Sequence, residues 1–309
     1  MAKHWALARI PKANDRRMKN SSKKTNAKVR SIAAYCILGL LIIACGDTGT
    51  PSKEFPVTPT PQPVETPISP AVTEPIPTPV VTVISEQEDT LPEAVPANFL
   101  PLVDGFGFQN FGGNTADSRL TAADLAVMFG PNGICEDLAE WKKQKRCVGT
   151  TTALQFLRQL NKVLENGLCY GMSAMSSRFF ANTVDPTAFQ DTAISPFDLT
   201  KDATISHQLA YWHAIQFTAE ARATSNQFDM AYPSEVIQQL AASLQESNGI
   251  QYSLGMYSEH GGHAVTPYKV DETTSSMKVW FYDNNWPGEE RWMELDKETE
   301  EWTYGFASV

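Results

Sequence analysis

Hydrophobic spacing predicts helices between residues 121 and 244. Apolar residues recur every three or four positions in three segments, which is the period of one helix face. These residues are Leu154, Leu157, Leu160 and Leu164; Leu209, Trp212, Ile215 and Phe217; and Val236, Ile237, Leu240 and Leu244. A further short helix is expected over 121–129, because Thr121 and Asp124 fit an N-cap with an acid three residues on, and Gly130-Pro131 ends it.

From Ile250 onward the pattern changes to alternation. Apolar residues alternate with small or polar ones in two segments, which is typical of strands with one buried face, and a third segment follows a glycine pair. A last pair completes a run of about five predicted strands. The segments are 252–256, 265–270, 277–281, 291–295 and 301–306. Helices followed by about five antiparallel strands predict an α+β fold for the globular part, residues 98–309.

The first 45 residues have the pattern of an export signal. Ten basic residues and one acid precede an apolar run from Ile32 to Ala44. Its 13 residues suit a signal peptide and fall short of the ~20 that a spanning helix needs. The run ends in Ile42-Ile43-Ala44-Cys45-Gly46, which resembles the lipobox of bacterial lipoproteins and implies lipidation of Cys45. An uncleaved anchor is the alternative, and Met18 would give a signal of ordinary length.

Residues 46–97 form a second region of different composition. Proline, threonine, valine and glutamate dominate it, and no helical or strand period is present. Proline fixes φ and removes backbone donors, so the segment favours extended polyproline II and cannot build a core. We therefore expect a disordered stalk between the lipid anchor and the globular domain.

Charge argues against nucleic acid as a partner. Of 25 basic and 35 acidic residues, ten basic and one acidic lie in the first 45, so the rest of the chain has a formal charge of −19. Such a surface repels phosphate backbones and anionic lipid. Membrane association is therefore expected only through the lipid anchor, at the outer side of the bacterial cell membrane.

The cysteines suggest one disulfide and one reactive thiol. With Cys36 in the signal and Cys45 lipidated, three cysteines remain in an exported domain where disulfides persist. Cys135 and Cys147 flank a short polar segment and are the candidate pair. Cys169 is then the candidate free thiol.

Cys169 follows Gly167, where one helix should end, and begins the segment expected to form the next helix. A helix N-terminus favours a thiolate, as a nucleophile requires. The alternative is a buried structural cysteine, the commoner role of a single cysteine.

A histidine and an acid are placed to serve that thiol. His263 opens a predicted strand behind Gly261-Gly262, and the glycines allow another backbone to approach closely. Asp283 and Asn284 end the next strand, and either can orient the imidazole as the third member of a triad. Alternation puts them on opposite faces, and Asp283 is favoured.

This order of cysteine, histidine and Asp/Asn resembles that of the papain-like cysteine peptidase superfamily. The turn Asn284-Asn285-Trp286 is similar to the Asn-Ser-Trp of papain-type enzymes, whereas Asp283 resembles the aspartate of double-glycine-leader peptidases. Similar blocks occur in uncharacterised bacterial surface proteins. They are Cys-Tyr-Gly-Met-Ser from 169, Gly-Gly-His-Ala-Val from 261 and Tyr-Asp-Asn-Asn-Trp-Pro-Gly from 282.

The resemblance implies a papain-like domain that acts as an extracytoplasmic cysteine peptidase or amidase through an acyl-enzyme. Its substrate would be a peptide or protein, cell-wall peptide included, and no cofactor is implied. The sequence departs from the family at Val163, where papain-type enzymes have a glutamine that donates to the oxyanion. Gln159, Asn161 or Asn166 is expected to replace it, and Asn166 is nearest to Cys169 in the sequence.

Three other functions compete with this interpretation. The domain could be an inactive papain-like binding module for peptide or carbohydrate, using Trp280, Trp286, Trp292 and Trp302, although strand tryptophans usually serve packing. The segment 283–294 partly matches a calcium loop, but position 5 is Pro287 and strands flank it.

A metal site is not expected, because His207 and His213 are six residues apart and do not share a helix face. His260 is expected to face solvent.

Overall fold

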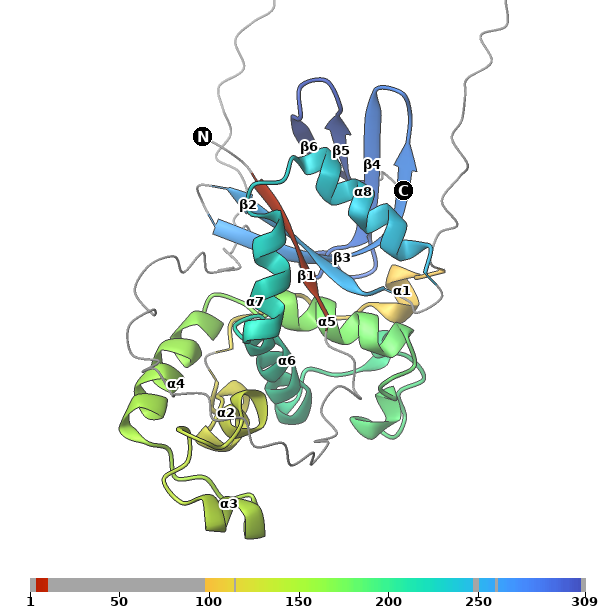
Figure 1. Ribbon diagram of the computed structural model, residues 1–309. Helices are drawn as coiled ribbons and strands as arrows, with labels where there is room; N and C mark the ends of the chain where they lie inside the picture. Colours follow the sequence, from red (N-terminus) through yellow and green to blue (C-terminus); the bar gives the residue numbers. More distant parts are fainter. Residues whose placement is uncertain (1–3, 11–97, 114, 247–249, 259–260, 307–309) are drawn as a thin grey trace, which may run out of the picture.

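The computed structural model describes residues 4–10, 98–113, 115–246, 250–258 and 261–306. Apart from one strand near the N-terminus, the helices come first in the chain and the sheet second (Figure 1). The helices are α1 (Pro101–Asp104), α2 (Ala122–Phe129), α3 (Leu138–Gln144), α4 (Thr151–Leu164), α5 (Cys169–Phe180), α6 (Ala203–Ile215), α7 (Ala219–Ser225) and α8 (Pro233–Leu244). Short 3₁₀ turns η2 (Ala116–Ser118), η3 (Pro186–Ala188), η4 (Pro196–Asp198) and η5 (Asn226–Phe228) lie between them.

The sheet has six antiparallel strands, and its order follows the sequence from β1 to β6. The strands are β1 (His4–Arg9), β2 (Tyr252–Ser258), β3 (Gly261–Glu272), β4 (Ser276–Tyr282), β5 (Glu290–Asp296) and β6 (Trp302–Phe306). Strands β2 to β6 lie where the five segments were predicted, so the α+β class is confirmed. Strand β1 was not predicted, because its residues lie in the basic segment assigned to the signal.

Local sequence rules account for the predicted helices. Thr121 caps α2, and its side chain and that of Asp124 bond each other's backbone N–H in a capping box. Gly130 then takes a positive φ of 86°, which ends the helix. Helices α4 and α8 also lie where apolar spacing predicts them, whereas the short α3 and α7 carry too few periodic residues to be predicted.

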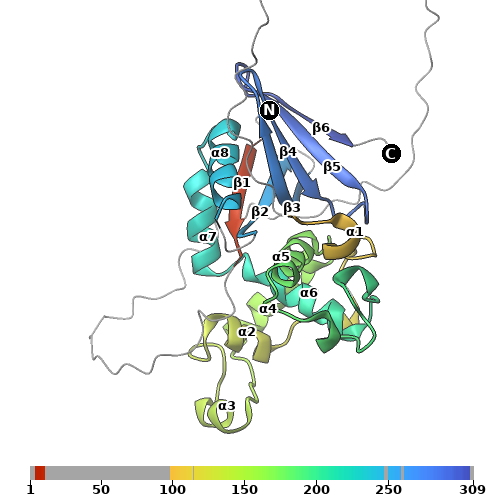
Figure 2. The same ribbon diagram turned by 90° about the vertical axis from the view of Figure 1, so that its right-hand side faces the viewer.

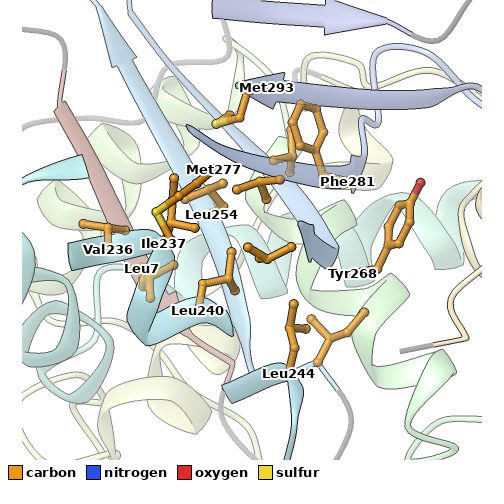
Figure 3. Packing of buried hydrophobic residues seen from close by; sticks show 14 of the residues in the cluster. Leu7, Val236, Ile237, Leu240, Leu244, Leu254, Tyr268, Met277, Phe281 and Met293 are labelled. Carbon is orange, nitrogen blue, oxygen red and sulfur yellow. The ribbon is translucent and has the colours of Figure 1, made fainter. Parts of the chain in front are cut away.

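Helix α8 packs across the sheet and closes the larger core. Its buried residues Val236, Ile237 and Leu240 meet apolar side chains of the strands in one cluster (Figure 3). The second cluster lies among α2, α4, α5 and α6 and includes Leu164, Met172 and other helix residues. Figure 2 shows α5 below the sheet and α8 beside it, so α5 connects the two cores.

Cys135 and Cys147 form a disulfide that brackets α3. The two Cα atoms are 5.1 Å apart, and Cys135 also pairs as a bridge with Gly149. This is the pair that the short polar loop suggested.

Within the described part of the chain, no helix has the length and apolar character needed to cross a membrane.

Candidate active site

Helix α5 carries Cys169 at its first position, as the sequence predicts. Gly167 has a φ of 130°, a conformation that favours glycine, and it turns the chain from α4 into α5. Two residues further on from Cys169, Gly171 allows α5 to touch α6. A Cβ at position 171 would lie 2.0 Å from the carbonyl oxygen of Leu209, so only glycine fits this crossing.

A buried hydroxyl cluster fixes α5 to the sheet. The Ser173 hydroxyl lies 2.6 Å from that of Ser253 on β2 and donates to the carbonyl of Val265 on β3 over 2.9 Å. Thr266 Oγ1 in turn lies 3.0 Å from Ser173 Oγ. Because Ser173 is one helical turn after Cys169, this contact holds the helix N-terminus beside the beginning of β3.

Asn284 connects the Cys169 backbone to the strand that carries the histidine. Its Nδ2 donates to the carbonyl of Cys169 over 3.1 Å and to that of Ala264 over 2.9 Å. Ala264 directly follows His263, and Asn284 is fully buried. One amide therefore holds the candidate nucleophile and the candidate base in adjacent parts of the fold.

The acid that binds His263 is Asp283. Its Oδ1 lies 2.7 Å from His263 Nε2 and accepts the backbone N–H of Asn285 over 2.8 Å. The Tyr304 hydroxyl donates to the other oxygen. Asn284 has the different role described above, so the structure separates the two residues that the sequence left as alternatives for the third position.

Burial alone would raise the pKa of Asp283, but its partners reverse the effect. The side chain is 3% exposed, and the charge and hydrogen bond of His263, the Tyr304 hydroxyl and the Asn285 N–H together hold its pKa below the ordinary value. Asp283 is thus a carboxylate that orients the imidazole through Nε2. The other ring nitrogen, Nδ1, is buried and has no hydrogen-bond partner among the described residues.

Cys169 differs from the sequence prediction in its oxidation state. It is fully buried and disulfide-bonded, whereas the sequence left it as a free thiol. That prediction followed from placing Cys36 and Cys45 in the signal and from pairing Cys135 with Cys147. In the described state the sulfur is neither a thiolate nor hydrogen-bonded to His263 Nδ1.

The candidate oxyanion donors fall into three groups. Asn161 is buried and satisfies both the N–H and the carbonyl of Leu120, so its side chain has a structural role. Gln159 and Asn166 are exposed, Gln159 on α4 and Asn166 just beyond its end. The structure adds Asn110, whose Oδ1 accepts the N–H of Leu168, the residue before Cys169.

Asn110 and Tyr304 are the site residues that the sequence did not indicate. The backbone N–H of Asn110 also donates to the Asn284 carbonyl over 2.7 Å, so the glycine-rich segment before α2 borders the site. Tyr304 lies on β6, two strands from β4, and no local pattern marks it. The signal for Asn110 was the unusual Gly105–Gly113 segment, where glycines permit close backbone approach, as at Gly107 against the Phe197 carbonyl.

The other histidines have roles outside the site. His207 pairs with Asp124 across 3.1 Å, and this hydrogen bond is the main cause that raises the pKa of His207. His213 is fully buried against Tyr170, and burial lowers its pKa to about 4, so it is a neutral core residue. His260 lies outside the described residues. Among the residues with described positions, no group of three or more His, Cys, Asp or Glu side chains is arranged to hold a metal.

The partial calcium motif is not assembled as a calcium loop. Strands β4 and β5 flank it, Asp283 is committed to His263, and Glu294 lies in β5 with an oxygen 3.9 Å from Lys278 Nζ. Trp280 and Trp302 pack against the larger core, whereas Trp286 is exposed. Trp280 and Trp292 are cross-strand neighbours, and Trp280 Nε1 donates to Asp271.

Comparison with protein-family models, with curated proteins and with solved structures gave no significant match for this chain. The class that the coordinates define is an α+β protein, in which a helical region is followed by a curled antiparallel sheet. A bonded His–Asp pair lies at one end of that sheet, beside the start of α5. These contacts are the basis for a functional hypothesis.

Proposed function

We propose that the protein is a papain-like thiol peptidase or amidase in which Cys169 attacks, His263 carries the proton and Asp283 orients the histidine. The observation that carries the proposal is that the two imidazole nitrogens of His263 have different surroundings. Nε2 is bound to a buried carboxylate, while Nδ1 is buried and has no hydrogen-bond partner in the part of the chain that the structure describes. Asn284 connects the next residue, Ala264, to Cys169. An imidazole held in this way has one nitrogen left to accept a thiol proton.

The reaction begins with reduction of the Cys169 disulfide by a thiol reductant, which is oxidised as it releases the cysteine thiol. Nδ1 of His263 then takes the thiol proton, and the sulfur forms a bond to the substrate carbonyl carbon. Collapse of the tetrahedral intermediate breaks the C–N bond, and the amine leaves with the proton from His263. Water hydrolyses the thioester by the reverse proton transfers, which restores the thiol. No cofactor is needed for these steps.

The proposed location is the outer face of the bacterial cell membrane, through a lipid on Cys45. That residue and the stalk 46–97 lie outside the described residues, so the support is the lipobox-like sequence alone. A peptide or protein at the cell surface, cell-wall peptide included, is the expected substrate. Release of the protein from membranes by Cys45→Ala would test the anchor.

A second function is favoured by the disulfide at Cys169. If that bond persists in the working protein, the domain is a binding module for peptide or carbohydrate. In that case, Cys169→Ala would leave binding unchanged. The two functions differ in one measurable property, the reactivity of Cys169 after mild reduction.

The test is the rate of Cys169 alkylation by iodoacetamide against pH in the full chain, before and after mild reduction with dithiothreitol. Mass mapping of peptides would separate Cys169 from the other four cysteines. A peptidase predicts alkylation only after reduction, with an inflection well below the value of ~8.5 typical of a free thiol. His263→Ala should remove that inflection and His207→Ala should not, since His207 lies elsewhere, paired with Asp124. An inflection near 8.5 in the wild-type, His263→Ala and His207→Ala proteins alike would refute the peptidase and favour the binding module.

A further inference from the structure

The edge of β2 is occupied by a segment from the far end of the chain. Strand β1 pairs antiparallel with β2 along its whole length, from His4 opposite Tyr257 to Arg9 opposite Tyr252 (Figure 1, red strand). Ile10 continues the pairing, and its N–H donates to the carbonyl of Gln251 over 2.8 Å. Between β1 and residue 98 lies the long stretch outside the described residues, so β1 joins the sheet as a nearly separate peptide would.

The direction of every N–H in this segment follows from that hydrogen bond. In an antiparallel pair, the residues that exchange hydrogen bonds alternate with those whose N–H points away. Because the Ile10 N–H faces β2, those of Ala8 and Ala6 face it too. The N–H groups of Leu7 and Arg9 point away from β2.

The side chains of the segment reach two different surroundings. Leu7 is fully buried in the core under α8, with Leu240 and Leu254 (Figure 3). Ala8 and Ile10 are buried on the opposite face of the strand, in the cluster that contains Cys169. That cluster also contains Tyr170, Ala174, Tyr257 and Ala264.

We propose that the β2 edge is a binding site for extended peptides and that residues 4–10 occupy it in the described chain. The ligand class is a peptide in strand conformation, with a leucine-sized side chain facing α8, as Leu7 does, and small or aliphatic side chains facing the cluster that contains Cys169, as Ala8 and Ile10 do. This rests on the proposed function, for which it names the substrate class and the direction of approach. Cleavage before Cys45 would remove the present occupant and open the edge to a peptide in trans.

The first experiment compares two neighbouring proline variants of the full chain. Ala8→Pro removes an N–H that faces β2 and puts ring carbons against that strand, so it should release the segment. Arg9→Pro removes an N–H that points away and should leave the strand in place. A fluorescent peptide with the sequence of residues 3–12 should then bind the Ala8→Pro chain, and should not bind the wild-type or Arg9→Pro chain, as measured by anisotropy.

The second experiment modifies the peptide and keeps the protein fixed. N-methylation at Ala8 should weaken binding about tenfold or more, because it removes a hydrogen bond and places a methyl group against β2. N-methylation at Leu7 should leave affinity within about twofold. Equal losses at both positions, equal binding to wild-type and Ala8→Pro chains, or no binding at ~1 mM peptide would overturn the site.

Binding and thiol reactivity are separate readouts. An unreactive Cys169 with the expected pattern of N-methylation would refute the peptidase and keep the peptide site. A reactive Cys169 without peptide binding would refute the site and keep the peptidase.

Discussion

Asp283→Asn tests whether the His–Asp pair is a charged, cooperative unit. The substitution keeps the shape of the side chain and removes its negative charge. In the native site the carboxylate accepts from His263, Tyr304 and the backbone of Asn285, and it is 3% exposed. An amide can accept on one atom only and would turn its NH₂ group toward at least one of these donors.

The expected cost is about 2 kcal/mol of unfolding free energy. A hydrogen bond to a charged group contributes about 1.5–3 kcal/mol, and rotation of the Tyr304 hydroxyl or a change of histidine tautomer can recover part of the loss. For a domain of this size, about 2 kcal/mol lowers the melting temperature by about 4–8 °C.

The assay is thermal unfolding by circular dichroism at several pH values, with Asp271→Asn as the matched control. Because the folded pKa of Asp283 is lowered, its charge stabilises the protein above the unfolded value of ~3.9, and this contribution is lost as pH falls through the folded pKa. The loss of stability caused by Asp283→Asn should therefore be full at pH 7 and become smaller toward pH 3. Asp271 is more exposed and pairs with Lys269, so its change should cost under about 1 kcal/mol. A deficit that is absent at pH 7, or that stays constant to pH 3, would refute the argument.

Three further substitutions test other parts of the structure, each by melting temperature. Gly171→Ala should destabilise by about 3 kcal/mol or prevent folding, because its Cβ would meet the α6 backbone; a melting point equal to wild type would mean that the helices are not so close. Removing the disulfide by Cys135→Ser with Cys147→Ser should cost about 3 kcal/mol for a loop of 12 residues separation, and an unchanged midpoint would argue that the bond does not form. His207→Gln should cost at most about 0.5 kcal/mol after screening. Since the folded pKa of His207 is raised, that loss should appear below pH ~6.5 and vanish as pH rises through the folded value; the reverse trend would contradict the pairing with Asp124.

The elements that sequence predicted are those whose signal is local. Alternation marks β2 and β4, a glycine pair precedes β3, and the capping box of Thr121 marks α2, because each signal depends on neighbours within a few residues. Strand β1 is different. Its six residues pair with a strand almost 250 residues away, and the basic residues around it matched an export signal just as well.

In the site, too, some residues have a local sequence signal and others depend on distant contacts. Cys169 at the start of a helix, His263 in a strand and Asp283 at a strand end follow from local pattern. Alternation places Asp283 and Asn284 on opposite faces, and in the structure their partners differ, His263 for Asp283 and the Cys169 carbonyl for Asn284. Asn110 could not be predicted, because its contact with Leu168 depends on how the segment before α2 folds back across α5. The oxidation state of Cys169 also could not be predicted, since disulfide pairing is a property of three-dimensional proximity.

Strand β1 and the disulfide at Cys169 were not indicated by the sequence, and both concern access to Cys169. The described chain has β1 on the β2 edge and Cys169 in a disulfide, and neither arrangement leaves a thiol open to a substrate. Cleavage before Cys45 would remove β1, and a reductant would free the sulfur; the Asn284 and Asp283 contacts depend on neither event. Peptide cleavage therefore needs both changes, whereas alkylation by the small reagent iodoacetamide needs only the reduction. If reduction alone gave the full chain peptidase activity, β1 would not control access of the substrate, and the β2 edge would be a structural strand pairing and not a peptide site.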